Sequence, residues 1–542
     1  MADTPTSRIA YKVLINGTPL SNEVGVMSVS TMCYFNKIAS AKLKVEDGDV
    51  AARDFLQSNS DLFKPGNELE IQLGYDDNPS TIFKGIIIRH CIKVKGGSFL
   101  EIEAKDKAVR LSQVRKSKYF IKKTDKDIIE ELVGAYGLDK SVDVTEGEHT
   151  QMVQYYCSDW DFILMRAEAN AMFVHTDNGE ILVKKPIITP SSALTATYGD
   201  NIIEFEGEMD ARRHFVKMQA SAWDFDKQKT NPEATRDGVY ALAESGDLAA
   251  SALGEVLGQT MELKHNGRLL DKELELWANA HAMKNRLSKA SGRVRILGNP
   301  SIKPGQNIRL AGVGDRFNGD VFVTGVLHQY DGEFTTDIQF GWAQDWFYKH
   351  DDIIEKPSSG LVPGVTGLQI GKVKKLTLPT DGSGRPNHIQ IDLPMVSKGG
   401  DGIWARVAVP DAGQDRGFVF RPEVGDEVIV GFINDDPRDA VILGMLHSQA
   451  KLPPSTLPQN DENHKKGLVT RSGMTLIFDD ENSVVTISVP AGGAEKSITI
   501  GESGAIEMKD EHQNIFKMDA AGITISTPKI IKIEGQTAVN IN

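Results

Sequence analysis

Residues 498–508 read Ile-Thr-Ile-Gly-Glu-Ser-Gly-Ala-Ile-Glu-Met, which places the apolar pair Ile498/Ile500 eight residues before the pair Ile506/Met508. Alternation within each pair is typical of a β-strand, because side chains two residues apart lie on the same face. The same eight-residue step returns near the end of the sequence, in the pairs Ile523/Ile525, Ile531/Ile533 and Val539/Ile541, and Phe516 with Met518 lies between the two sets. The stretch therefore predicts short strands separated by turns.

Such a ribbon has one narrow apolar face and no second layer of its own to cover it. Ile and Val dominate the segment after Leu476, and this composition suits a thin, regular core. We therefore expect the ribbon to bury its face against copies of itself, as a solenoid-like prism made by several chains. The alternative is an ordinary antiparallel meander packed on the domain before it.

Length, composition and charge narrow the class of protein. The 542 residues predict several domains, and 40% hydrophobic with 25% charged residues is ordinary for a globular chain. The formal charge of −14 argues against nucleic acid as the main partner. The polar start Met1–Arg8 and the lack of an apolar run of membrane-spanning length predict neither a secretory signal nor a membrane span. The widely spaced Cys33, Cys91 and Cys157 predict reduced thiols.

The first part of the sequence reads as strands and turns, and one of its patterns occurs twice. Lys64-Pro65-Gly66 precedes a strand-like run and then Gly85, while Lys303-Pro304-Gly305 precedes a similar run and then Gly325. The offset is 239 residues at the lysines and 240 at the second glycines. We interpret the two copies as two β-barrel domains of related build, with coincidence in a short match as the alternative.

Between the two copies the apolar period changes from two residues to about 3.6. Thr124 with Asp127, and Ser158 with Asp161, are typical of capped helix starts, and a third helix is expected from Asp271. The basic stretch Arg115–Lys126 suggests an anion site, but we favour a solvated loop.

After a linker at Ser358-Ser359-Gly360 the sequence predicts a small barrel of five strands. Its clear strands are Ile389–Leu393, Ala405–Val409, Val428–Ile433 and Val441–Leu446. The acidic and amide residues Asn434–Pro437 between two of them are interpreted as a turn rather than a cation site.

One run in this barrel carries a specific resemblance. Residues 417–432, Gly-Phe-Val-Phe-Arg-Pro-Glu-Val-Gly-Asp-Glu-Val-Ile-Val-Gly-Phe, continue to Asp436-Pro437 and Ile442-Leu443-Gly444, with Trp404–Val407 upstream. This run resembles the oligonucleotide/oligosaccharide-binding (OB) fold domain of spike proteins of contractile injection systems, a family that includes VgrG proteins of type VI secretion, phage tail spikes and spikes of extracellular contractile particles. The opening section favours a particle or phage-like system.

The resemblance implies a mainly β fold with helical insertions. It comprises two related β-barrel domains, an OB-fold barrel and a C-terminal triple-stranded β-prism, or β-helix, formed by a homotrimer. The expected division is 1–113 first β-barrel domain on the tube-adaptor side, 114–200 mixed α/β insertion, 201–357 second β-barrel domain with a helical insert, 358–450 OB-fold barrel, 451–470 linker and 471–542 prism. The trimer core of the prism would comprise Ile498, Ile500, Ile506, Met508, Phe516, Ile523, Ile525, Ile531, Ile533, Val539 and Ile541.

The implied partners are two sister copies, a hexameric inner tube protein, baseplate proteins, effector cargo and a PAAR-type tip protein seated on Asn540, Ile541 and Asn542. By this resemblance the protein is made in a bacterial cytoplasm and leaves as part of a contractile particle on firing. The implied role is the central spike that joins tube and baseplate to a membrane-piercing tip.

The sequence gives little sign of catalysis. It contains no phosphate-binding loop, no zinc-protease motif, no Gly-x-Ser-x-Gly and no Cys-x-x-Cys. Asp159 and Asp161 are interpreted as helix-start charges rather than a carboxylate pair. We predict a non-enzymatic protein without cofactor, metal or nucleic acid. The alternatives are a trimeric tail-spike hydrolase or adhesin acting on polysaccharide or peptidoglycan, and a plain nucleic-acid-binding barrel protein.

Overall fold

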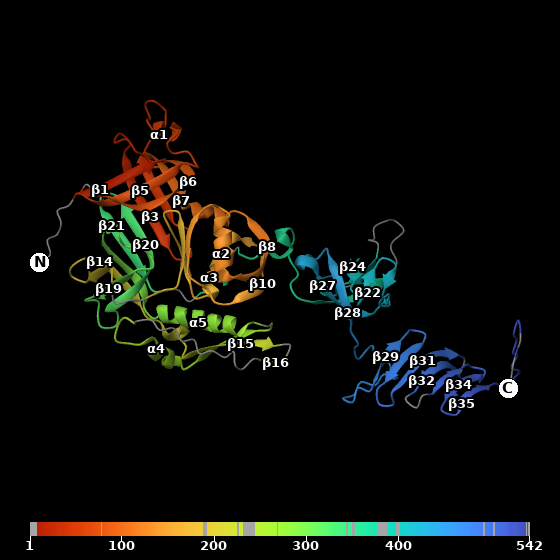
Figure 1. Cartoon of the computed structure of the whole chain (residues 1–542). Helices are drawn as coiled ribbons and strands as arrows, with labels where there is room; N and C mark the ends of the chain where they lie inside the picture. Colours follow the sequence, from red (N-terminus) through yellow and green to blue (C-terminus); the bar gives the residue numbers. More distant parts are fainter. Residues whose placement is uncertain are drawn as a thin grey trace. The chain divides into compact units, whose positions relative to one another are not determined.

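The computed structural model describes residues 8–76, 78–187, 192–224, 227–230, 244–267, 269–342, 345–349, 353–376, 387–396, 401–491, 494–501, 505–537 and 539. The fold is mainly β, as the sequence predicts (Figure 1). The chain forms two compact units, the first ending at Glu355 and the second beginning at Lys356, and each is described by itself.

The first unit is built on one sheet of 13 strands, which draws on both β-rich parts of the unit. Its central junction is the antiparallel pair β20–β3, where His328 is the register partner of Thr31. In sheet order the main path is β14 (Ile202–Glu208), β18 (Ser291–Leu297), β21 (Phe334–Phe340), β20 (Gly319–Tyr330), β3 (Val26–Tyr34), β4 (Ser40–Glu46), β7 (Ser98–Lys105), β6 (Ser80–Val94), β5 (Glu68–Tyr75), β1 (Ile9–Ile15) and β2 (Thr18–Pro19), while β19 (Asn307–Ala311) joins β20 to β13 (Leu194–Thr197).

Two hydrophobic cores lie along this sheet. One is formed by strands β1 to β7 and includes Leu43, Ile71 and Ile102, while the other is formed by β13 and β18 to β21 and includes Val294, Ile308 and Ile338. The two cores are separate, while the division into two β-barrel domains stays a prediction. The structure differs in joining them: in the described residues their strands follow one open hydrogen-bonded path, rather than two separately closed barrels.

The repeated Lys-Pro-Gly pattern forms the same local structure in both places. Gly66 N donates to Ile87 O at 2.8 Å, and Gly305 N donates to Val323 O at 2.9 Å. Both glycines have positive φ, 102° and 90°, which favours glycine at this turn. The turn is therefore shared, but the second landmark is not: Ile87 follows Gly85 by two residues, whereas Val323 precedes Gly325 by two. Gly85 pairs with the strand after the turn and Gly325 with other strands, so two β-barrels of related build stay a prediction.

A mixed α/β segment follows the first β region and has its own core. As predicted, a helix starts after Thr124 with both capping-box bonds in place, and another starts after Ser158. The basic stretch Arg115–Lys126 is predicted to be a solvated loop, but most of it forms the strand β8, which pairs with β10. Lys118 and Lys123 of this strand both form ion pairs with Glu131. The elements are β8 (Arg115–Thr124), α2 (Asp125–Gly134), β9 (Asp139–Val142), β10 (Glu148–Ser158), α3 (Asp159–Ala169), β11 (Phe173–Asp177) and β12 (Glu180–Lys184).

The third predicted helix, α5 (Asp271–Leu287), lies beside the strand labelled β15 (Figure 1). Its Leu274 and Ala278 pack against Ala220 and Leu263 of neighbouring strands. Its Lys284 is buried and forms an ion pair with Glu168 of α3, so α5 also contacts the mixed segment. The remaining elements here are β15 (Lys217–Asp224), β16 (Lys229–Thr230), α4 (Ala250–Leu257) and β17 (Thr260–His265), and the short α1 (Leu56–Asn59) belongs to the first β region.

The second unit contains a closed barrel of five strands in the order β22-β23-β24-β28-β27, as the sequence predicts. Val428, Val430 and Ile442 lie in its interior and are fully buried. The strands are β22 (Gln369–Lys375), β23 (His388–Asp392), β24 (Ile403–Val407), β27 (Glu427–Phe432) and β28 (Ala440–Met445), and a small hairpin is formed by β25 (Ala412–Gly413) and β26 (Arg416–Gly417).

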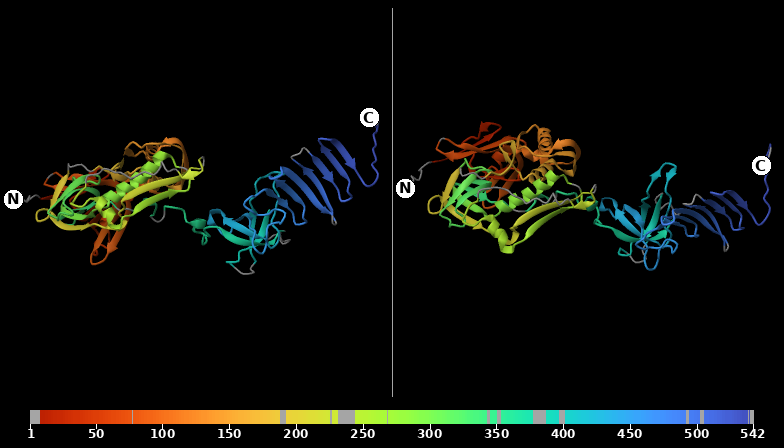
Figure 2. Two further views of the ribbon diagram at one scale, coloured as in Figure 1. Left: turned by 90° about the horizontal axis from the view of Figure 1, so that it is seen from below. Right: turned by 60° about the horizontal axis from the view of Figure 1, so that its bottom comes forward.

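The C-terminal segment forms a sheet of seven consecutive antiparallel strands, seen in Figure 2 as successive rungs. Within the described part of the sheet each ladder joins a strand to the next one along the chain, so the strand order is that of a meander. Short strands are confirmed as far as Ser526, but the strand predicted at Ile531/Ile533 is wrong, since the described residues 527–537 contain no strand. The sheet begins at Lys465, inside the linker predicted at 451–470. Its strands are β29 (Lys465–Val469), β30 (Thr475–Asp479), β31 (Val484–Ala491), β32 (Ala494–Ile500), β33 (Ile506–Lys509), β34 (Ile515–Asp519) and β35 (Gly522–Ser526).

Candidate functional site

The strand register gathers the large apolar side chains of the C-terminal sheet on one face. Residues directly opposite each other on neighbouring strands share a face, so the pairings can be followed across the sheet. They give two rows, one of Leu468, Leu476, Ile487, Ile498, Met508, Phe516 and Ile525, the other of Phe478, Val485, Ile500, Ile506, Met518 and Ile523. We call these two rows the apolar face.

The other face of the same sheet is mostly polar. One of its rows runs through Thr486, Thr499, Glu507, Lys517 and Thr524. The apolar face is open in the single chain, since Ile487 is 48% exposed and Ile525 56% exposed. A groove of about 580 Å³ runs along it, lined among others by Ile498, Met508 and Phe516. Monomeric proteins rarely expose so long a continuous apolar surface, so this face is the candidate interaction site.

Most of the predicted trimer-core residues lie on this face. Ile498, Ile500, Ile506, Met508, Phe516, Ile523 and Ile525 belong to the two rows, whereas Ile531, Ile533 and Val539 follow the last strand and are exposed. Asn540, Ile541 and Asn542 lie outside the described residues. Five members between Leu468 and Ile487 were missed, although Leu476/Phe478 and Val485/Ile487 show the same alternation. Leu468 and Leu476 are eight residues apart, but the steps from Leu476 to Ile487 and from Phe478 to Val485 are 11 and 7 residues, and the register reveals that they continue the rows.

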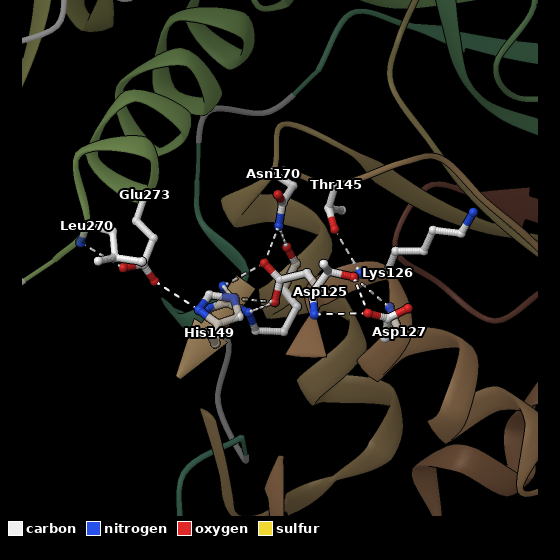
Figure 3. Close-up of polar contacts among 10 residues, drawn as sticks. Asp125, Lys126, Asp127, Thr145, His149, Asn170, Leu270 and Glu273 are labelled. Atoms are coloured by element: carbon white, nitrogen blue, oxygen red, sulfur yellow. Dashed lines mark hydrogen bonds and ion pairs between the residues drawn. The ribbon is translucent and has the colours of Figure 1, made fainter. Parts of the chain in front are cut away.

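A second candidate site, in the first unit, is a network of buried charged side chains around Asp125, the first residue of α2 (Figure 3). Arg166 of α3 donates to its carboxylate at 2.6 and 2.9 Å, and Asn170 donates at 2.7 Å. His149 Nε2 lies 3.1 Å from Asp125 Oδ1, while its Nδ1 lies 3.2 Å from Glu273 Oε1 on α5. The network therefore joins α2, β10, α3 and α5 through side chains that are mostly buried.

The same contacts set the protonation states. Hydrogen bonds to Asp125 and then Glu273 raise the pKa of His149 to about 9, so the imidazole is cationic at neutral pH. Burial alone would raise the pKa of Asp125, but the bonds from His149 and Arg166 outweigh it and hold the pKa of the carboxyl below its usual range. The network is a cation–anion–cation–anion chain, which suits a structural clamp rather than acid–base chemistry.

Buried histidines predict how stability depends on pH. Burial lowers the pKa of His175 and His328 to about 4 and that of His281 to about 3, so these side chains stay neutral in the folded state. Below pH 6.5 these histidines bind protons in the unfolded chain but not in the folded chain, so the free energy of unfolding falls towards pH 4. His149 has the opposite effect: its contribution to the free energy of unfolding is complete below pH 6.5 and is lost as the pH rises to about 9.

We therefore expect the melting temperature of the first unit to be highest near neutral pH and to fall on both sides. Calorimetry from pH 4 to 9.5 measures it. A His149→Gln variant should be less stable at pH 7 and should lose part of the fall between pH 6.5 and 9 while keeping the acid fall. A melting temperature that stays constant from pH 4 to 7 would contradict the assignment of buried neutral histidines.

The candidate carboxylate pair has structural contacts. Asp161 forms a hydrogen bond with Ser158, the N-cap of α3. Asp159 is buried and accepts hydrogen bonds from Lys116, Tyr136 and Gln154.

Among the described residues no group of three or more His, Cys, Asp or Glu side chains is placed to hold a metal ion. All three cysteines are free. No described helix combines the length and apolar character that crossing a membrane would require.

Comparison with protein families gives two matches. The model of the Alg8 N-terminal domain matches residues 5–332, more than half of the chain. The model of the type VI secretion system/phage-baseplate injector OB domain matches residues 369–447, which contain the closed barrel.

Individual relatives match over shorter stretches. The actin cross-linking toxin VgrG1 of Vibrio cholerae is 41% identical over 69 residues, 13% of this chain and 6% of the relative. The type VI secretion system spike protein VgrG1c of Pseudomonas aeruginosa is 30% identical over 130 residues, 24% of this chain and 17% of the relative. A prophage MuSo2 43 kDa tail protein from Shewanella oneidensis has a similar structure at 13% identity and a TM-score of 0.45, covering 63% of this chain and 98% of that protein. The chain therefore belongs to the family of the Alg8 N-terminal domain, carries an OB domain of the type VI secretion system/phage-baseplate injector type, and is similar to VgrG and phage-tail spike proteins of contractile injection systems over the matched stretches.

Proposed function

We propose that the protein is the homotrimeric, non-enzymatic central spike of a contractile injection machine. The observation that carries this proposal is the open apolar face of the C-terminal sheet, in a chain of the spike-protein family. Three copies would place their apolar faces around one axis, so that each sheet forms one side of a three-sided prism. Burial of apolar surface stabilises such an assembly by about 25 cal/mol per Å².

The arrangement within each chain favours this geometry. Consecutive strands already satisfy one another's backbone groups, so the copies need to contribute side-chain packing and not ladder bonds. In this layout the apolar residues point to the axis, while the row of Thr, Glu and Lys side chains points to solvent. A needle with a dry interior and a polar surface suits a part that is pushed through an envelope by an external motor.

The domain layout extends the proposal to the partners. Residues 1–113 and 201–357 would supply two related β regions per copy, hence six in a trimer, which matches a hexameric inner tube and its baseplate. Residues 358–450 would form the OB-fold barrel, and the needle would begin with the sheet at Lys465. The last residues would seat a PAAR-type tip protein, with effector cargo as a further partner. The particle would carry the protein from the bacterial cytoplasm to the target on firing.

The molecular mass of the purified full chain tests the proposal. We expect native mass spectrometry to give three times 59.4 kDa, and electron micrographs to show a tapered needle. A monomer at micromolar concentration would contradict it.

The proposed absence of catalysis has a separate test. The trimer should release no soluble product from peptidoglycan or capsular polysaccharide under conditions in which a lysozyme control does. Measurable turnover would favour a tail-spike hydrolase instead.

A further inference from the structure

The first unit contains a pocket of about 280 Å³ beside α5, whose lining includes no residue of the network around Asp125. Met218 of β15 and Met261 of β17 are register partners, and both line the pocket together with Phe215. Trp346, which follows β21 in the sequence, supplies a further apolar wall and is 8% exposed. A preformed pocket with apolar walls and a few polar groups is where a ligand is expected first.

The described lining also carries a surplus of positive charge. Arg213 and Lys349 lie at its edge, with side chains 63% and 56% exposed, and Asp345 Oδ1 lies 3.0 Å from the first and 3.7 Å from the second. Asp345 is the one acidic residue of this described lining. Lys284, the third cation, is buried and neutralised by Glu168. Two exposed cations therefore have a single carboxylate between them, and an anion in the pocket would complete the balance.

His281 of α5 adds a hydrogen-bond donor to the lining. Burial and the nearby cations Lys284 and Lys349 lower the pKa of His281 to about 3, so the ring is neutral at physiological pH and carries one proton. Trp346 Nε1 donates to His281 Nδ1 at 3.1 Å, which leaves that proton on Nε2. Within the part of the chain that the structure describes, no group accepts a hydrogen bond from this N–H. Its acceptor therefore has to come from water or from an oxygen of a ligand.

The wall that carries Trp346 is held in place by buried contacts. Lys284 Nζ donates to Asp345 O at 2.7 Å, and Phe347 N donates to Glu168 Oε2 at 2.9 Å. The segment 345–349 is thus fixed against α5 and α3 before any ligand arrives. A preformed pocket loses less conformational entropy on binding than one that has to be ordered first.

We propose that this pocket binds the C-terminal residue of a partner protein, an apolar side chain followed by a free carboxylate. The side chain would pack against the two methionines and Trp346. The carboxylate would accept a hydrogen bond from His281 Nε2 and pair with the surplus charge of Arg213 and Lys349. The site lies within one copy of the chain and does not depend on the trimer.

Size and access favour the end of a peptide over a whole small-molecule ligand. The volume of about 280 Å³ is just below the range of about 300–1,000 Å³ that such ligands occupy, so it suits one side chain. The edge with Arg213 and Lys349 is exposed, so the rest of the partner's chain can leave the pocket there.

Calorimetric titration of the full chain with short peptides tests the proposal. The hexapeptide Gly-Ser-Gly-Ser-Gly-Phe with a free carboxylate should bind saturably, and its C-terminal amide should bind roughly tenfold or more weakly, because a charged hydrogen bond is lost. Absence of saturable binding at millimolar peptide, or equal affinity of acid and amide, would overturn the proposal. Phenylacetate binding as tightly as the free-acid peptide would assign the pocket to a small acid and overturn the protein partner.

Arg213→Gln removes one of the two exposed cations, and Arg212→Gln is its matched control. Arg212 is the chain neighbour of Arg213, is 82% exposed, pairs with Asp210 and does not line the pocket. Neither substitution should change the melting temperature noticeably, since exposed ion pairs contribute little to stability.

The two variants should differ in peptide binding. Arg213→Gln should weaken binding of the free-acid peptide roughly fivefold or more and leave the amide unchanged, because it removes a charge that only the carboxylate uses. Arg212→Gln should bind both peptides as the wild type does. Equal effects of the two substitutions would overturn the carboxylate site. Peptide binding by a wild-type chain that is monomeric by mass would remove the proposed function and leave this site standing.

Discussion

Replacing Ile498 and Ile525 together with aspartate is expected to abolish the trimer. Both side chains lie in the same row of the apolar face, Ile498 pairing with Met508 and Ile525 with Phe516. Six carboxylates would then have to enter a dry axis, and each unpaired buried charge costs several kcal/mol. Native mass spectrometry or sedimentation velocity should report monomers at concentrations where the wild type is trimeric.

The matched control adds the same charge to the other face of the same two strands. Thr499 and Thr524 are the chain neighbours of Ile498 and Ile525 and belong to the polar row. The Thr499→Asp, Thr524→Asp variant should remain a trimer with a slightly more acidic surface. Equal loss of trimer in both variants would point to damaged strands rather than to a buried axis, and a stable trimer with aspartate at 498 and 525 would refute the prism.

The second large effect is expected from Asp125→Asn in the buried charge network. The substitution leaves Arg166 and His149 without their shared carboxylate, and removing one partner of a buried ion pair typically costs about 3–5 kcal/mol. Because the network joins α2, α3, β10 and α5, the whole first unit should unfold at lower denaturant concentration. Urea unfolding followed by circular dichroism measures the change.

Asp127→Asn is the control for this variant. Asp127 lies two residues further along (Figure 3) and belongs to the exposed capping box with Thr124. Loss of a cap contact costs about 0.5–2 kcal/mol, so this variant should be clearly more stable than Asp125→Asn. The two substitutions change the same charge, so a similar loss of stability in both would mean that the buried contacts of Asp125 contribute little.

Local sequence signals predicted the elements well where the physical cause is itself local. Thr124 with Asp127 and Ser158 with Asp161 start helices because a side-chain oxygen accepts from a backbone N–H three residues on, a contact that needs no tertiary structure. Alternating apolar residues likewise predicted the C-terminal strands as far as Ser526, but not beyond, where Ile531 and Ile533 lie outside any strand.

Features that depend on distant partners were not predictable in the same way. The stretch after Arg115 reads as a polar loop because its lysines face solvent, but β10, more than thirty residues later, supplies its ladder and Glu131 neutralises two of its charges. His149 carries no local sign of its role, since Asp125 and Glu273 come from two separate helices. The union of two β regions in one sheet rests on the β20–β3 pair, which joins residues about 300 positions apart.

The sequence by itself determined that this chain is mainly β, that it carries an injector-type barrel, and that its C-terminal strands have one apolar side, because these properties follow from residue type and spacing along the chain. Tertiary structure alone decided which apolar residues share a face and which charges meet. Strand register and helix packing set both, and each is fixed by contacts between segments that the linear order keeps apart.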